Sequence, residues 1–266
     1  MKNSLFLFFC WSVTFVGFAK ADLTRIEPRD LLNHYHVPQE AFLDPEGEPV
    51  QTFKLQLEAL SHDERPESQV LSGSLEAYAV KDLLAGEEES KDLVIVSSEA
   101  VYFKRPLEKL LRVLTNYTQK PFFNPIVDLV VHGRQEISPG ELSVSHLTTV
   151  TEKKKFIAKL RLVCPTEVYH RALSGGSVQL QTQVVDCKRE GSNDVWVVQG
   201  VRTVNFTPIS ETETLVVVNN LARNRIHGLT IFQIKPSNRD LLGAVREVSE
   251  DFVQELLQRT SDESGE

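Results

Sequence analysis

The stretch SNRDLLGAVREVSEDFVQELLQ, residues 237–258, decides the fold because it predicts one long amphipathic helix. Ser237 can cap its start, and Asp240 follows three residues on, in the manner of a capping box. Apolar side chains then recur at helical spacing, and charged ones fill the opposite face. The apolar stripe consists of Leu241, Leu242, Val245, Val248, Phe252, Val253, Leu256 and Leu257. A helix this amphipathic must lie on a large apolar surface, which the rest of the chain has to supply.

A run of strands before that helix can supply this surface. Short apolar runs rich in β-forming residues lie at 93–103, 126–131, 142–150, 155–163, 178–185, 195–206 and 214–218. Turn-forming segments separate most of them, and connections this short make neighbouring strands antiparallel. After the first run, Pro106 can open a short helix whose leucines recur at i, i+3, i+4 and i+7. The pattern predicts an α+β fold in which about seven antiparallel strands wrap around the final helix.

Residues 22–90 differ in character from the strand-rich remainder of the chain. Within them, residues 52–60 alternate between apolar and polar side chains, which predicts a strand. The acidic, glycine-containing segment 86–91 is the best boundary in the sequence. We therefore expect an N-terminal extension at 22–90 that adds a strand or packs on one edge, a main domain at 91–260 and a disordered tail at 261–266.

The first 21 residues have the three-part layout of a secretory signal peptide. A short charged start precedes an apolar stretch at 5–18, and Ala19 and Ala21 precede a cut before Asp22. An uncleaved N-terminal anchor is the alternative, although the apolar stretch is short for a membrane span. No later segment reaches the about 18 apolar residues that an integral membrane helix needs. The mature chain is thus predicted to be periplasmic or secreted.

The net charge of the mature chain limits the kinds of partner that it is expected to bind. Removing residues 1–21 leaves 27 basic against 37 acidic residues, a net charge of −10. Nucleic acid and anionic membranes both attract basic surfaces, so this balance argues against either as a standing partner. An apolar content of 41% with 25% charged residues is typical of a globular chain.

Two local motifs stand out: VLTNY at 113–117 with FFNPIV at 122–127, and VNFTP at 204–208 followed by ETET at 211–214. They resemble stretches of the START-like superfamily, which includes polyketide cyclases and coenzyme Q-binding proteins, and the second is similar to its strand–turn–strand. Asn116 stands where the family often carries Asp. The resemblance implies a helix-grip fold that holds a hydrophobic, lipid-like small molecule between the sheet and the final helix.

Under this resemblance, side chains that face the final helix are candidates for ligand contact. Strand alternation places Trp196, Arg202 and Phe206 on one face and aligns His146 with Val144 on another. His146 and Arg202 would then point inward or lie at a rim, where polar groups could orient a guest. The alternative is that these side chains fill a packed core. The predicted ligand-binding residues are Phe122, Phe123, His146, Trp196, Arg202, Phe206, Val245 and Phe252.

Catalytic signatures are poor in this sequence. It has no HExxH, Gly-x-Ser-x-Gly, P-loop or Rossmann glycine pattern, and His34 and His36 have no third metal ligand nearby. We expect a non-enzymatic binding protein with no metal and no cofactor. A cyclase- or hydrolase-type enzyme that uses the same cavity and a protein-interaction module are the alternatives.

Cys164 and Cys187 are the cysteines that remain after signal removal, in a compartment that favours disulfides. Gly175 and Gly176 lie midway between them and suit a two-residue hairpin turn that would set the cysteines opposite each other. Simple alternation puts the two cysteines on different faces, and a β-bulge near Pro165 would remove this conflict. A disulfide between them is therefore predicted, with two free thiols as the alternative.

Overall fold

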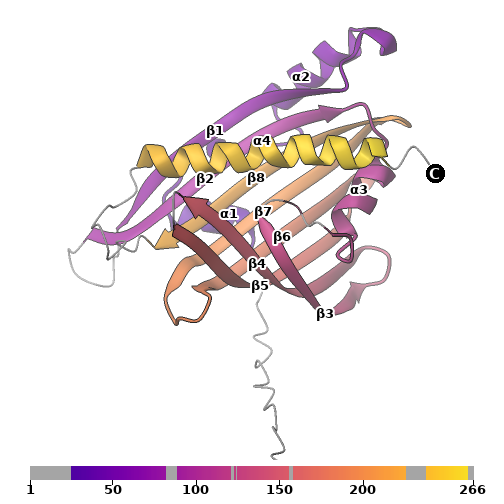
Figure 1. The fold of residues 1–266 in the computed structure, drawn as a ribbon. Helices are drawn as coiled ribbons and strands as arrows, with labels where there is room; N and C mark the ends of the chain where they lie inside the picture. The colour runs from indigo at the N-terminus through magenta and orange to yellow at the C-terminus, as the bar shows by residue number, and fades with distance from the viewer. Residues whose placement is uncertain are drawn as a thin grey trace, which may run out of the picture.

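The computed structural model describes residues 25–81, 89–120, 123, 125–155, 158–225 and 238–262. This part of the chain forms one antiparallel sheet in the order β1-β2-β8-β7-β6-β5-β4-β3, with a long helix across one face (Figure 1). The strands are β1 (Ser68–Lys81), β2 (Glu89–Phe103), β3 (Ile126–Ser138), β4 (Leu142–Lys155), β5 (Ala158–Ala172), β6 (Val178–Arg189), β7 (Val195–Ser210) and β8 (Glu213–Arg225). The helices are α1 (Pro28–His34), α2 (Glu48–Glu58), α3 (Leu107–Thr115) and α4 (Asn238–Asp262), with short 3-10 turns η1 (Gln39–Ala41), η2 (His62–Glu64) and η3 (Ser174–Gly176).

Helix α4 covers what we call the inner face of the sheet, as the final apolar stripe predicted. Alternate residues of β2, β6, β7 and β8 point toward α3 and α4, because successive side chains of a strand face opposite sides. These side chains form one buried apolar cluster: Val101, Phe103, Leu110, Val113, Leu180, Val204, Phe206, Val216, Val218, Phe252, Val253 and Leu256. Each fully buried side chain of this kind is worth about 1.5–3 kcal/mol, so the contact holds the helix on the sheet.

The outer face of the sheet is covered by the N-terminal segment, and Figure 1 shows α1 behind the strands that α4 crosses in front. One apolar cluster joins α1 to β2, β7 and β8, with Leu32 of α1 fully buried. A second joins α2 to β2 and β8. Strand β1 also belongs to this segment and pairs with β2 at the sheet edge. The sheet therefore has eight strands, one more than the about seven predicted.

The predicted strand at 52–60 is wrong, since these residues belong mostly to helix α2. Val50, Phe53 and Leu57 are buried at i, i+3 and i+7, whereas Leu55 is 64% exposed. The same apolar residues fit a helical spacing once Val50 is included, and Pro49 suits the first turn of a helix. The alternating pattern at 52–60 was too short to distinguish the two-residue period of a strand from the 3.6-residue period of a helix.

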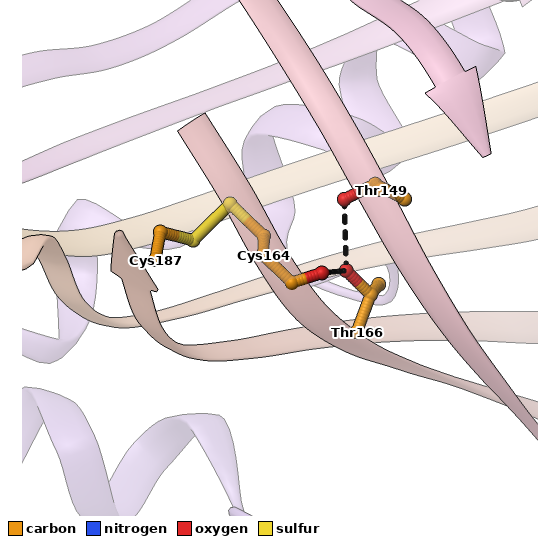
Figure 2. The surroundings of a disulfide bond; sticks show 4 residues. All are labelled: Thr149, Cys164, Thr166 and Cys187. Atoms are coloured by element: carbon orange, nitrogen blue, oxygen red, sulfur yellow. Dashed lines mark hydrogen bonds between the residues drawn. A yellow bond between two sulfur atoms is a disulfide. The ribbon is translucent and has the colours of Figure 1, made fainter. Parts of the chain in front are cut away.

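The disulfide between Cys164 and Cys187 is present and joins β5 to β6 (Figure 2). The pairing register shifts by one residue between Val163 and Thr166, as the face conflict required. The extra residue lies on β6, opposite Pro165 rather than beside it, and Asp186 has a left-handed φ of 50° there. The hairpin turn is longer than two residues, because η3 occupies it and Leu173 N–H donates to Ser177 O.

The predicted signal peptide at 1–21 lies outside the described residues. Among the described residues, no helix has the length and apolar character to span a bilayer. Helix α4 continues to Asp262 and so includes the first two residues of the predicted tail, whereas residues 263–266 lie outside the described residues.

Candidate functional site

A row of polar side chains crosses the inner face beneath α4. Ser97 of β2 is paired with Asn220 of β8, which is paired with Arg202 of β7, which is paired with Thr182 of β6. Asn220 Nδ2 donates to Ser97 Oγ at 3.1 Å, and Arg202 Nε donates to Asn220 Oδ1 at 2.5 Å. We call these four residues the polar row. It lies beside the apolar cluster that packs against α4.

Arg202 is the charged member of the row. Its guanidinium carbon lies 5.3 Å from the centroid of the Phe252 ring of α4, a cation–π distance. Burial lowers the pKa of Arg202, and the charge of Glu99 on β2 acts in the opposite direction. Arg202 nevertheless keeps part of its surface accessible, unlike Val204 and Phe206 further along β7.

Aromatic contacts extend from Phe252 to the corner that follows α3. The rings of Phe252 and Phe123 are 5.5 Å apart and tilted by 46°. The guanidinium carbon of Arg259, which follows Phe252 by about two turns of α4, lies 4.2 Å from the Phe123 ring centroid. Phe123 therefore connects the corner before β3 to the helix above the polar row.

The cross-strand register continues the row to β4, where a second polar group lies. Thr182 is paired with Val168 of β5, and Val168 is paired with Ser145 of β4. Burial raises the pKa of Tyr117, although a hydrogen bond with Ser145 and the charge of Arg134 oppose it. Tyr117 thus lies at the far end of the same line of residues.

His170 of β5 also belongs to this second group. Burial lowers the pKa of His170, and the positive charge of Arg134 adds to the effect. Arg134 donates to Ser143 Oγ at 3.0 Å, and Ser143 is paired with His170 across β4 and β5. His170 is therefore favoured in its neutral form, in which the ring can both donate and accept a hydrogen bond.

Four of the predicted ligand residues come together on the inner face. Arg202, Phe206 and Phe252 meet there, and Phe123 packs against the same cluster. Phe122 lies outside the described residues, and so does the side chain of Val245. The two cysteines predicted to form a disulfide, Cys164 and Cys187, are described above.

Trp196 does not follow Arg202 onto the inner face by simple alternation. The pairing of β7 shifts between Val197 and Gln199 against β8, and it shifts again near Trp196 against β6. Each shift inserts one residue into β7, so simple alternation does not determine the face of Trp196. The role of Trp196 in ligand contact stays a prediction.

His146 lies on the outer face, contrary to the predicted inward position. Its Nδ1 is 3.1 Å from Glu167 Oε1, and Gln183 Nε2 donates to the other oxygen of Glu167 at 2.8 Å. Gln183 Oε1 accepts from the Ile26 backbone N–H at 3.1 Å, which ties the cluster to the N-terminal segment. Both faces of β4 are buried, with Val144 and Leu147 each 4% exposed on opposite sides. Alternation therefore could not tell the faces apart.

Sequence reasoning missed three members of the polar row. Asn220 had a visible signal, because Asn219 and Asn220 interrupt the apolar run of β8. Asn219 serves the outer face, where it exchanges two hydrogen bonds of 2.9 Å with the backbone of Leu43. Ser97 and Thr182 carried no signal of their own, since serine and threonine are common in strands.

No protein-family model matches this chain, and no curated protein sequence matches it. Solved structures do match, among them proteins described as START or StAR-related lipid transfer proteins and aromatase/cyclases. A STAR-related lipid transfer protein from Xanthomonas axonopodis is 9% identical, with a TM-score of 0.44, over 74% of this chain and 99% of that one. Human StAR-related lipid transfer protein 5 is 13% identical, with a TM-score of 0.42, over 81% and 94%.

An aromatase/cyclase from Streptomyces is 11% identical, with a TM-score of 0.40, over 63% of this chain and 94% of that one. These likenesses concern the arrangement of sheet and helix. At these TM-scores they say nothing about what this chain binds.

Proposed function

We propose that this protein is an exported carrier of a hydrophobic, lipid-like small molecule, held between the inner face of the sheet and α4. The polar row would orient the polar group of that molecule, and the apolar side chains around it would contact the rest. Ligand sites of this kind are mostly apolar and carry a few convergent polar groups. The domain that carries the site would be residues 91–260.

The observation that carries this proposal is the environment of Arg202. Burial is deep enough to lower its pKa, yet part of the side chain remains accessible. Arg202 donates to Asn220 on the inner face and its guanidinium lies over the Phe252 ring of α4, so a guest held between the sheet and α4 would meet it. An ionised group is costly to bury, so a guest that covers the polar row would need a polar group of its own to meet Arg202.

The neighbours of Arg202 indicate what kind of partner would fit. Asn220 accepts one hydrogen bond from the guanidinium, and Glu99 lies within electrostatic range of it. The opposite charges of Glu99 and Arg202 offset each other, which favours a neutral polar group such as a hydroxyl or carbonyl over a second anion. The rest of the guest would lie against Phe252 and the apolar cluster.

Solvent extraction of the purified full chain, followed by mass spectrometry, tests the proposal. We expect a reproducible apolar molecule from the wild type and its loss or replacement in Arg202→Met, which keeps an unbranched side chain but removes the charge and the hydrogen-bond donors. Arg171→Met is the matched control, because Arg171 is exposed at the end of β5. A wild-type protein that is empty and takes up no hydrophobic probe would contradict the proposal.

The same experiment separates the enzyme alternative. A cyclase- or hydrolase-type enzyme would convert an added candidate molecule during incubation, whereas a carrier would return it unchanged. Tyr117 and His170 are the titratable side chains of the second polar group, so activity that depends on them would favour the enzyme.

A further inference from the structure

The line of cross-strand neighbours that starts in the polar row continues to the edge strand β3. Ser145 of β4, which ends the line described above, is paired with Arg134 of β3. Directly paired residues of neighbouring strands have their side chains on the same face of the sheet. Arg134 therefore shares the inner face with Arg202, and one line of neighbours carries an arginine at two separate places.

Arg134 has polar neighbours but, among the described residues, no ion-pair partner. It donates to Ser143 Oγ at 3.0 Å, and its positive charge acts on Tyr117 and His170. Glu136 is paired with Ser143 and faces the same side, but it is exposed, and no ion pair joins it to Arg134. A guanidinium that has hydroxyl and imidazole groups around it and no carboxylate partner is suited to binding an anion.

The groups around Arg134 match the two oxygens of a carboxylate. An arginine can donate two parallel hydrogen bonds to a carboxylate, and the hydroxyls of Tyr117 and Ser145 are further donors. The neutral ring of His170 keeps one N–H. Arg134 is exposed on the edge strand, so a carboxylate bound there would stay partly hydrated and would avoid the cost of full burial.

The two arginines of the line are far enough apart to meet different ends of one molecule. Ser145, beside Arg134, lies on β4 and Arg202 lies on β7, with Val168 and Thr182 between them. Neighbouring strands are about 4.8 Å apart, so these three spacings amount to about 14 Å along the sheet. One place is suited to a neutral polar group, as argued above, and the other to an anion.

We propose that the carried molecule has a carboxylate at one end, bound at Arg134, and a hydroxyl or carbonyl about 14 Å away, bound at Arg202. Its apolar middle would lie over Val168, the apolar member of the line between the two places. This inference rests on the proposed carrier function and narrows the ligand to one chemical class. A simple alcohol or a simple fatty acid would fill only one of the two places.

Equilibrium dialysis of the full chain, freed of bound lipid on a hydrophobic resin, tests this inference with defined probes. The probes are ω-hydroxydodecanoic acid, its methyl ester, which lacks the charge, and dodecanoic acid, which lacks the hydroxyl. We expect the wild type to bind the hydroxy acid about tenfold more tightly than either of the others, because hydrogen bonds to charged groups are the stronger ones and the ester and the fatty acid each lose one end.

The variant Arg134→Gln should bind both acids about tenfold more weakly and the ester as the wild type does. Arg171→Gln is the matched control, because Arg171 is also exposed but follows His170 on β5 and so faces the other side of the sheet. It should bind all three probes as the wild type does. The comparison of acid with ester uses the wild type alone, so it decides the matter even if a variant does not fold.

Two kinds of failure can be told apart. Equal affinity of the wild type for the three probes, or undiminished binding of the acids by Arg134→Gln, would overturn this inference and leave the carrier function standing. Binding of none of the probes would also overturn it. The carrier function would fail with it only if solvent extraction of the purified protein yielded no apolar molecule either.

Discussion

Removal of the disulfide should cost a predictable share of stability. Cys164 and Cys187 are 23 residues apart in sequence, and the loop-entropy relation gives about 3 kcal/mol for a cross-link of that span. In a domain of this size, about 3 kcal/mol corresponds to a fall in melting temperature of roughly 6–12 °C. Both cysteines are buried, so the reduced thiols would stay in an apolar setting and add little penalty of their own.

Urea unfolding of oxidised and fully reduced wild-type protein measures this difference without changing any residue. We expect the reduced protein to unfold at a lower urea midpoint, and the Cys164→Ala, Cys187→Ala variant to match it. The slope with urea should be similar or slightly larger after reduction, because the unfolded chain then exposes more surface. Coincident midpoints, or two free thiols titrated in unfolded protein that was never reduced, would refute the reasoning.

Two further predictions concern the outer half of the molecule. Glu213 is 1% exposed; burial alone would raise its pKa, but a 2.7 Å hydrogen bond from Tyr102 and other partners outweigh this and lower it below 4.5. The ionised Glu213 side chain therefore stabilises the fold at pH values above the pKa of an unfolded glutamate. This stabilisation is lost as the pH falls through the pKa of Glu213 in the folded protein. Glu213→Gln should therefore destabilise by about 2 kcal/mol at neutral pH and by less in acid, and an equal loss in urea unfolding at both pH values would contradict this. Gly73→Ala should lower the free energy of unfolding by about 1–3 kcal/mol, because the added Cβ would lie 2.8 Å from the carbonyl oxygen of Ser98. Gly133→Ala is the control and should be nearly neutral, because a Cβ there would have nothing within 4 Å. Thermal unfolding compares the two variants, and equal losses of stability would refute the steric explanation.

The elements that sequence reasoning predicted well are those with a long, single period. The final helix was expected at 237–258 and is observed at Asn238–Asp262, because its apolar stripe runs over many turns. The seven expected strands all overlap observed ones, although several are longer and the one expected at 155–163 is observed at Ala158–Ala172, because Lys155 belongs to β4. Strand β3 extends to Ser138 through residues such as Arg134 and Glu136, which are polar because they lie on the sheet edge.

The site was predicted only in part, because it forms across strands rather than along one. Arg202 was found from alternation within β7, but its partners Ser97 and Asn220 come from strands that meet it only through the sheet order. Register cannot be read from alternation once bulges intervene, as Trp196 illustrates. His146 failed for another reason: the N-terminal segment buries the outer face too, which removes the contrast between faces.

The cysteine pair shows how far such reasoning extends. The face conflict between Cys164 and Cys187 correctly required one extra residue, and the structure contains that shift. Pro165 drew attention because it lacks an N–H, yet Asp186 on the partner strand accommodates the bulge. Aspartate tolerates the left-handed region better than most residues, which offers a sequence signal for such a position.

Photo-crosslinking from the two faces of the sheet tests the central claim most directly. A photoreactive residue at Thr182 would stand in the polar row on the inner face, and one at Thr148 of β4 would stand on the outer face with His146. Irradiation of protein loaded with its extracted molecule should attach that molecule at position 182 and leave position 148 unlabelled. Attachment at 148 alone, or equal labelling at both positions, would contradict a ligand held between the inner face and α4.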